Sequence, residues 1–193
     1  GGIPGLWAMA RDGSQPRRLT TGGDASPSFS PDGTWVAFQR SGVETTPWAV
    51  YRVFLRTGEV APITVPATMR PAVSPDGRFV AHYWMTPERW AMAVTPVEGG
   101  LPTRTFGVRP THVERLIHWA PDGTALAYID LASGASNLWL QPLPEGLPRM
   151  LTNFTEGSIS TFDWSRDGAS LAFMRVTEVA DVVAIDLGPS PRP

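Results

Sequence analysis

One short phrase occurs four times along the chain, and it constrains the fold more than any other feature. Each copy places a turn built on Asp-Gly between two apolar stretches. The first copy reads FSPDGTWVAFQR, and the fourth reads WSRDGASLAFMR, with Arg in place of Pro. The intervals between copies are 44, 46 and 45 residues. A regular internal repeat of this kind predicts a row of equivalent structural units. The turn residues are Asp32, Gly33, Asp76, Gly77, Asp122, Gly123, Asp167 and Gly168.

Each copy predicts a β-hairpin that packs against a neighbouring sheet. Asp can bond the backbone just beyond itself, and Gly accepts a positive φ at little cost. Five residues after each Asp stands an alanine, which would let the next sheet approach closely while larger residues fill the opposite interface. A period of about 40 to 50 residues with several short strands per unit is typical of a β-propeller. The alanines are Ala37, Ala81, Ala127 and Ala172.

The predicted fold class is all-β: a partial β-propeller of about four four-stranded antiparallel blades. A third strand is expected in the first unit and again in the last, at 181–188, while the last unit lacks its fourth strand. The two ends therefore overlap instead of completing each other. We expect the last part of a larger propeller, or a half-ring whose edge must be covered, with exposed sheet edges that could pair with other strands. The predicted divisions of the single segment 1–193 are a half blade at 5–20, blades at 25–64, 69–106 and 114–152, a three-stranded blade at 158–187, and a tail at 188–193.

Composition narrows the classes of function. The chain carries 16 Lys and Arg against 18 Asp and Glu, without a basic cluster that would follow a phosphate backbone, so nucleic-acid binding is not expected. No apolar run has the roughly 18 residues needed to cross a bilayer, and no signal peptide opens the sequence. The chain has no cysteine, which excludes disulfides, thiolate metal sites and a cysteine nucleophile.

The repeats resemble a known family. The phrases SFSPDGTWVAF, AVSPDGRFVAH and FDWSRDGASLAF, with RRLT and RMLT on predicted outer strands, are similar to the TolB-like class of WD-type (WD40-like) propeller repeats over about residues 6 to 187. The stretch 136–187 also resembles the C-terminal blades that follow a kinase or winged-helix module in some bacterial membrane-anchored proteins. The resemblance implies a periplasmic or otherwise extracytoplasmic module that binds a protein partner or a small ligand at one face.

An alternative comes from the same resemblance, because related propellers cover the active site of prolyl-oligopeptidase-type hydrolases. Such a propeller would be an accessory gate whose catalytic domain is absent from this sequence. The sequence holds no G-x-S-x-G nucleophile elbow. We therefore expect a non-catalytic binding module without cofactor or metal.

The candidate site residues are few. The four turn Asp residues are predicted to be structural, because catalytic groups must converge at one point. His118 and Asp163 occupy equivalent positions, four residues before the turn Asp, on predicted innermost strands. They are expected to pair across the interface or to face the central channel together, and a structural hydrogen bond is favoured because two groups make a poor metal site. His82 takes an aromatic position of the repeat and is expected in the core, whereas His112 is expected in a solvated loop.

The tryptophans are mostly expected in the packing between blades. Trp48 and Trp84 are the exceptions, because both fall at or near the ends of predicted loops. An exposed aromatic side chain at the rim of a propeller is a candidate hot spot for binding.

Overall fold

A computed structural model describes residues 4–41, 47–108, 116–132 and 134–177, and within these ranges every regular element is a β-strand. The strands form three four-stranded antiparallel sheets, each following chain order, and two two-stranded sheets. The N-terminal pair is β1 (Trp7–Ala8) and β2 (Arg17–Arg18), and the C-terminal pair is β15 (Ser158–Trp164) and β16 (Leu171–Val176). The first blade is β3 (Asp24–Phe29), β4 (Trp35–Arg40), β5 (Ala49–Phe54) and β6 (Val60–Pro62). The second blade is β7 (Thr68–Val73), β8 (Phe79–Met85), β9 (Trp90–Pro96) and β10 (Arg104–Gly107). The third blade is β11 (Ile117–Trp119), β12 (Ala125–Ala132), β13 (Ala135–Pro142) and β14 (Arg149–Met150).

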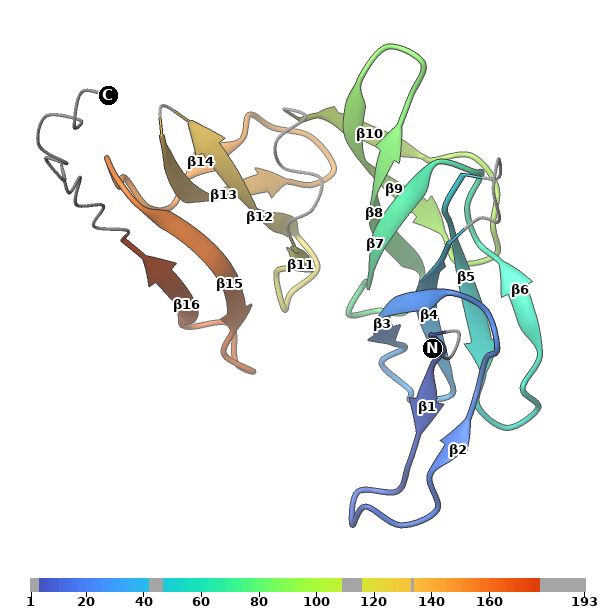
Figure 1. Cartoon of the computed structure of the whole chain (residues 1–193). Helices are drawn as coiled ribbons and strands as arrows, with labels where there is room; N and C mark the ends of the chain where they lie inside the picture. The colour runs from blue at the N-terminus through green and yellow to red at the C-terminus, as the bar shows by residue number, and fades with distance from the viewer. Residues whose placement is uncertain (1–3, 42–46, 109–115, 133, 178–193) are drawn as a thin grey trace, which may run out of the picture.

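The sheets stand side by side as the blades of an array (Figure 1). In Figure 1 the first strand of each blade lies toward the middle of the array and the last strand toward its outside. Strand β3 contacts β7, and β7 contacts β11. The N-terminal pair and the C-terminal pair lie at opposite ends of the array (Figure 1). The all-β architecture of four-stranded antiparallel blades predicted from the repeat is therefore confirmed.

The Asp-Gly turns have nearly the same geometry in all four copies. Their glycines have φ between 68° and 73°, a left-handed conformation that costs glycine little. In the first copy, Asp32 Oδ1 accepts hydrogen bonds from Ser30 Oγ at 2.7 Å and from the Thr34 backbone N at 3.0 Å. These bonds hold the Asp in its ionised form, so the pKa of Asp32 lies below its ordinary value. The fourth copy makes the corresponding bonds from Ser165 and Ala169 to Asp167, although Arg166 replaces the proline.

The repeated alanines lie where adjacent sheets meet. Ala37, Ala81 and Ala127 are completely buried, each in an apolar cluster shared with the following sheet. The opposite face of the same strand packs against the preceding sheet, as Phe38 does with Leu6. At these interfaces the alanines lie at the contact with the following sheet, as expected, but their face is not small throughout, because Trp35 lies in the cluster of Ala37 and Tyr83 in that of Ala81.

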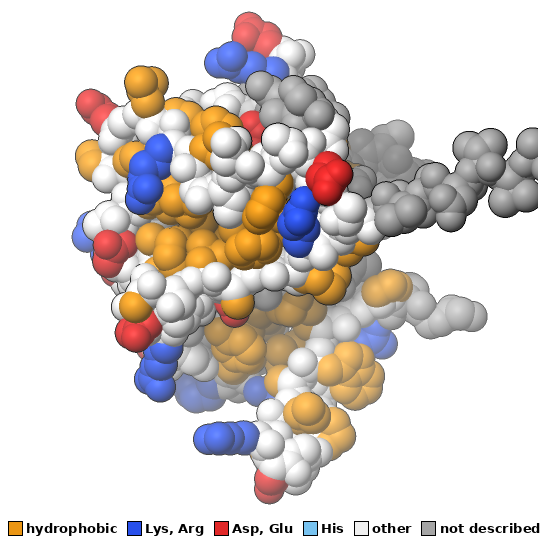
Figure 2. Space-filling view, turned by 90° about the vertical axis from the view of Figure 1, so that its left-hand side faces the viewer, with side chains coloured by type: hydrophobic (Ala, Val, Ile, Leu, Met, Phe, Trp, Pro, Cys, Tyr) orange, Lys and Arg blue, Asp and Glu red, His pale blue; other side chains and the backbone are white. Residues whose placement is uncertain are grey.

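The last described sheet differs from the others. Ala172, equivalent to the buried alanines, is exposed, and so are Phe173, Met174 and Val176 on the same strand. Figure 2 views the molecule from the side of β15 and β16, and apolar side chains gather on that side. Within the described part of the chain, no further sheet covers this strand. The predicted third strand at 181–188, the tail at 188–193 and His112 lie outside the described residues.

Candidate binding site at the inner strands

The inner strands carry an irregularity that the repeat did not reveal. The pairing of β3 with β4 shifts register between Ala25 and Ser28, and that of β7 with β8 shifts between Met69 and Ala72. At the two shifts, Ser26 and Arg70 have φ values of 54° and 58°, in the left-handed region that non-glycine residues seldom occupy. Residues with such strained backbone conformations cluster at ligand-binding sites, where the surrounding structure holds them in place.

These bulges help to form a cavity of about 470 Å³ between the inner strands of the three blades. Part of its wall comes from two positions of the repeat, six and four residues before the turn Asp. Side chains from equivalent positions of different blades therefore face one space. The residues at these positions that line the cavity are Ser26, Ser28, Arg70, Ala72, Leu116 and His118.

Arg70 is the positively charged group of this wall. Its guanidinium Nη1 donates to Ser26 Oγ of the neighbouring blade at 3.4 Å, and its backbone N donates to Gln39 Oε1 at 3.2 Å. Ser28 Oγ accepts from the Val73 backbone N at 3.0 Å, which joins the first and second blades again. Among the described residues no carboxylate pairs with Arg70, so its charge remains available to a ligand.

The structure brings His118 and Asp163 close together. Nδ1 of His118 lies 3.4 Å from Oδ1 of Asp163, on the inner strands of the third blade and the C-terminal pair. Burial lowers the pKa of His118, and the nearby carboxylate only partly opposes that effect. The His118 ring also packs at 4.7 Å from the ring of Phe162. Because the side chain of Asp163 is 79% exposed, the pair forms a polar end to the wall instead of a closed core contact.

The other predicted site residues lie elsewhere. Trp48, directly before β5, is 45% exposed, and half-buried Trp84 on β8 lines a separate cavity of about 290 Å³. The turn carboxylates lie at the loops between the first and second strands of each sheet and are engaged by their own turns. The structure therefore joins His118 to the inner wall but leaves Trp48 and Trp84 outside it.

The chemistry of the wall suits recognition of a polar surface. It offers a guanidinium, an imidazole whose lowered pKa favours the neutral ring, and serine hydroxyls. Together these groups can donate and accept hydrogen bonds. Among the described residues no three His, Asp or Glu side chains gather in a way that would hold a metal ion. No described segment forms a helix with the length and hydropathy of a membrane span.

No protein-family model matches the sequence, and no curated protein matches it either. The solved structures of similar fold include TolB from Acinetobacter baumannii, with a TM-score of 0.74 and 20% identity over 92% of this chain and 44% of that one. A putative TolB from Agrobacterium tumefaciens has a TM-score of 0.64 and 21% identity over 84% of this chain and 62% of that one. A prolyl endopeptidase has a TM-score of 0.58 and 15% identity over 80% of this chain and 27% of that one.

Identities this low show the fold alone. The chain spans 44% and 62% of the two TolB chains, so it corresponds to part of each propeller protein. The blades, their order and these likenesses agree with one another. The chain therefore has the fold of a partial β-propeller, similar to the corresponding parts of the two TolB structures.

Proposed function

We propose that the chain is a non-catalytic binding module that recognises a protein partner or a small ligand at its inner strands. One observation carries the proposal: Arg70, His118 and the serines of adjacent blades line one cavity. The guanidinium of Arg70 has no carboxylate partner among the described residues, and its backbone is strained. Both features favour a ligand with an anionic or hydrogen-bonding group beside Arg70.

The proposed setting is extracytoplasmic, as a sensor or scaffold. It is supported by the TolB-like fold and by the similarity of 136–187 to blades that follow a kinase or winged-helix module. The reading frame around this segment tests the setting directly. A kinase or winged-helix module upstream would support the sensor, whereas a signal peptide without either module would favour a free periplasmic binder.

A second candidate is the gating propeller of a prolyl-oligopeptidase-type hydrolase. The likeness to a prolyl endopeptidase over 80% of this chain favours it. In that case the inner wall would line the path of a peptide toward a catalytic domain. A hydrolase domain in the same reading frame would establish this candidate over the first.

The binding role can be tested with variants of the inner wall. Affinity purification from envelope extracts of the source organism would identify a partner, which would then be purified and titrated by calorimetry. Arg70→Asn removes the charge and keeps a residue that tolerates the left-handed backbone, so we expect at least about tenfold weaker binding. Arg149→Gln, on the exposed outer strand β14, is the matched control and should bind normally. Equal affinity of the Arg70 variant and the parent chain would overturn the assignment of the site.

A further inference from the structure

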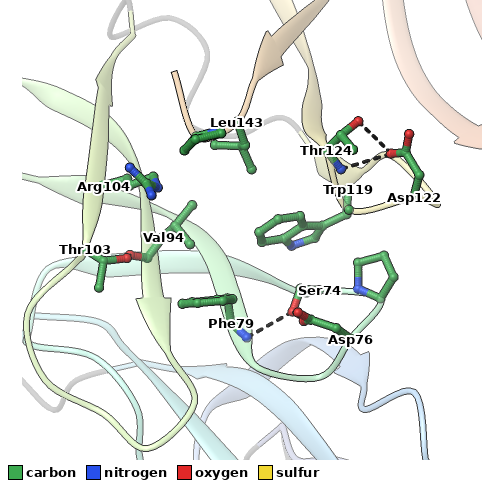
Figure 3. A pocket seen from close by; sticks show the side chains of 13 residues that line it. Ser74, Asp76, Phe79, Val94, Thr103, Arg104, Trp119, Asp122, Thr124 and Leu143 are labelled. Carbon is green, nitrogen blue, oxygen red and sulfur yellow. Dashed lines mark hydrogen bonds between the residues drawn. The ribbon is translucent and has the colours of Figure 1, made fainter. Parts of the chain in front are cut away.

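A second cavity, of about 700 Å³, lies between the second and third blades at the end where the Asp-Gly turns are. Phe79 and Trp119 form its aromatic walls, and Val94 and Leu143 add aliphatic surface. Figure 3 shows the two rings and Arg104 directed toward the same space from different strands. A volume of this size falls in the range of about 300 to 1,000 Å³ that is usual for small-molecule sites.

The packing around this cavity differs from that at the preceding interface. At the corresponding interface of the first and second blades, the residue equivalent to Phe79 is Trp35. Trp35 is only 7% exposed and packs in a buried cluster with Val80 and Val97. Phe79 offers a smaller ring at that position, and it stays half-buried at the cavity wall.

The aromatic wall is preorganised. Trp119 Nε1 donates a hydrogen bond of 2.8 Å to the backbone O of Ala72, across the interface between the two blades. The bond satisfies the only polar atom of the indole and fixes the orientation of the ring. A ligand that stacks on Trp119 therefore spends little free energy on ordering it.

The guanidinium of Arg104 is the positively charged group of this cavity that is available to bind a ligand. Arg104 is exposed on β10, and no hydrogen bond or ion pair engages its side chain among the described residues. The two carboxylates of the rim are bonded within their own turns and stay ionised: Oδ1 of Asp76 accepts from Ser74 Oγ and the Arg78 backbone N, and Oδ1 of Asp122 accepts from the backbone N and Oγ1 of Thr124. Figure 3 shows Asp122 bonded to Thr124, on the far side of Trp119 from Arg104. The unsatisfied donors of the cavity thus belong to Arg104.

We propose that this cavity binds a small carboxylate with an aromatic or branched apolar body. The body would lie between Phe79 and Trp119, and the carboxylate would pair with the Arg104 guanidinium, whose planar donors match two carboxylate oxygens. Two sources share this chemistry: a free aromatic acid, and the last residue of a peptide with its terminal carboxylate.

The test titrates the chain with N-acetylphenylalanine, with its neutral amide, and with a tetrapeptide that ends in phenylalanine. Calorimetry and tryptophan fluorescence would follow binding. We expect N-acetylphenylalanine to bind with a Kd below about 1 mM and the amide at least about tenfold more weakly, because a charge-assisted bond is lost. Arg104→Gln should lower the affinity for the acid to that for the amide. Tighter binding of the tetrapeptide would indicate a peptide terminus, and weaker binding a free acid; either result supports the site.

Matched variants separate the site from general stability. Arg149→Gln removes an exposed outer-strand arginine outside the cavity, and Trp164→Leu changes the tryptophan that is equivalent to Trp119 on the C-terminal pair. Both should bind N-acetylphenylalanine as the parent does, whereas Trp119→Leu should not. Equal binding of acid and amide, no effect of Arg104→Gln, or no binding of any of the three probes would each overturn the proposal.

Discussion

His82 stands where the other copies of the repeat carry Phe38, Tyr128 and Phe173. It is fully buried, with Nε2 2.9 Å from Thr95 Oγ1 and Nδ1 3.2 Å from the Tyr83 carbonyl. Since a carbonyl only accepts, Nδ1 carries the proton and Nε2 accepts from the threonine hydroxyl. The prediction of a packed, hydrogen-bonded imidazole is confirmed. Burial lowers the pKa of His82 to about 4, because the charged ring would lose its hydration.

The buried imidazole should make stability depend on pH. In the unfolded chain a histidine titrates near 6.5, so between about pH 6.5 and 4 the unfolded state binds more protons than the folded state. The free energy of unfolding should therefore fall as pH decreases through this window, by about 3 kcal/mol from His82. His82→Phe, combined with Thr95→Val to remove the orphaned hydroxyl, should lose this part of the dependence. Urea unfolding at several pH values would measure it, and parallel curves for parent and variant would contradict it.

At the scale of elements, the hairpin turns are the part of the fold that could be predicted from the sequence. Their Asp and Gly act on atoms two or three residues away, so the chemistry is contained in the repeat itself. The bulges of β3 and β7 could not be predicted in this way, because Ser and Arg seldom adopt the positive φ that Ser26 and Arg70 have. Their one local signal is the proline that follows each of them, Pro27 and Pro71.

The turn glycines should be required for their backbone conformation alone. Gly33 has φ +68°, and a Cβ added there would meet no atom within 4 Å. Gly33→Ala should therefore lower the free energy of unfolding by about 1 kcal/mol through the left-handed conformation, and Gly33→Asn by less. Gly107→Ala, at a position with ordinary φ and no neighbour of its Cβ closer than 3.6 Å, is the control and should change stability little. Thermal unfolding would measure the shifts, and similar losses for Gly33→Ala and Gly107→Ala would refute this explanation.

At the scale of the molecule, stacking of blades decides what each repeated residue experiences. Ala127 lies in the cluster between the third blade and the C-terminal pair, together with Ile159 and Phe162. Ala172 has the same place in the repeat, but it is exposed because no described sheet lies against it. A hydrogen bond from the backbone N of Ile159 to Ser136 Oγ also joins these two sheets. Equivalent positions of the repeat thus have opposite environments.

This difference predicts unequal effects of the same substitution. Ala127→Val would force two added methyl groups into a filled interface, which should cost about 1 to 3 kcal/mol. Ala172→Val adds the same groups to an exposed position of a strand and should change stability by no more than about 0.5 kcal/mol. Denaturant unfolding of both variants provides the comparison. Comparable destabilisation would show that the sheets do not stack as described.

The all-β class, the four hairpins and the spacing of the blades follow from the sequence, because each depends on residues close together along the chain. The third strand expected at 181–188 stays a prediction. Sequence reasoning aligned His118 with Asp163 but missed Arg70 and the pocket of Phe79, Trp119 and Arg104. Those groups meet only through the packing of sheets whose equivalent residues are about 45 positions apart in the sequence. Only the tertiary structure therefore shows the two cavities that we propose as binding sites.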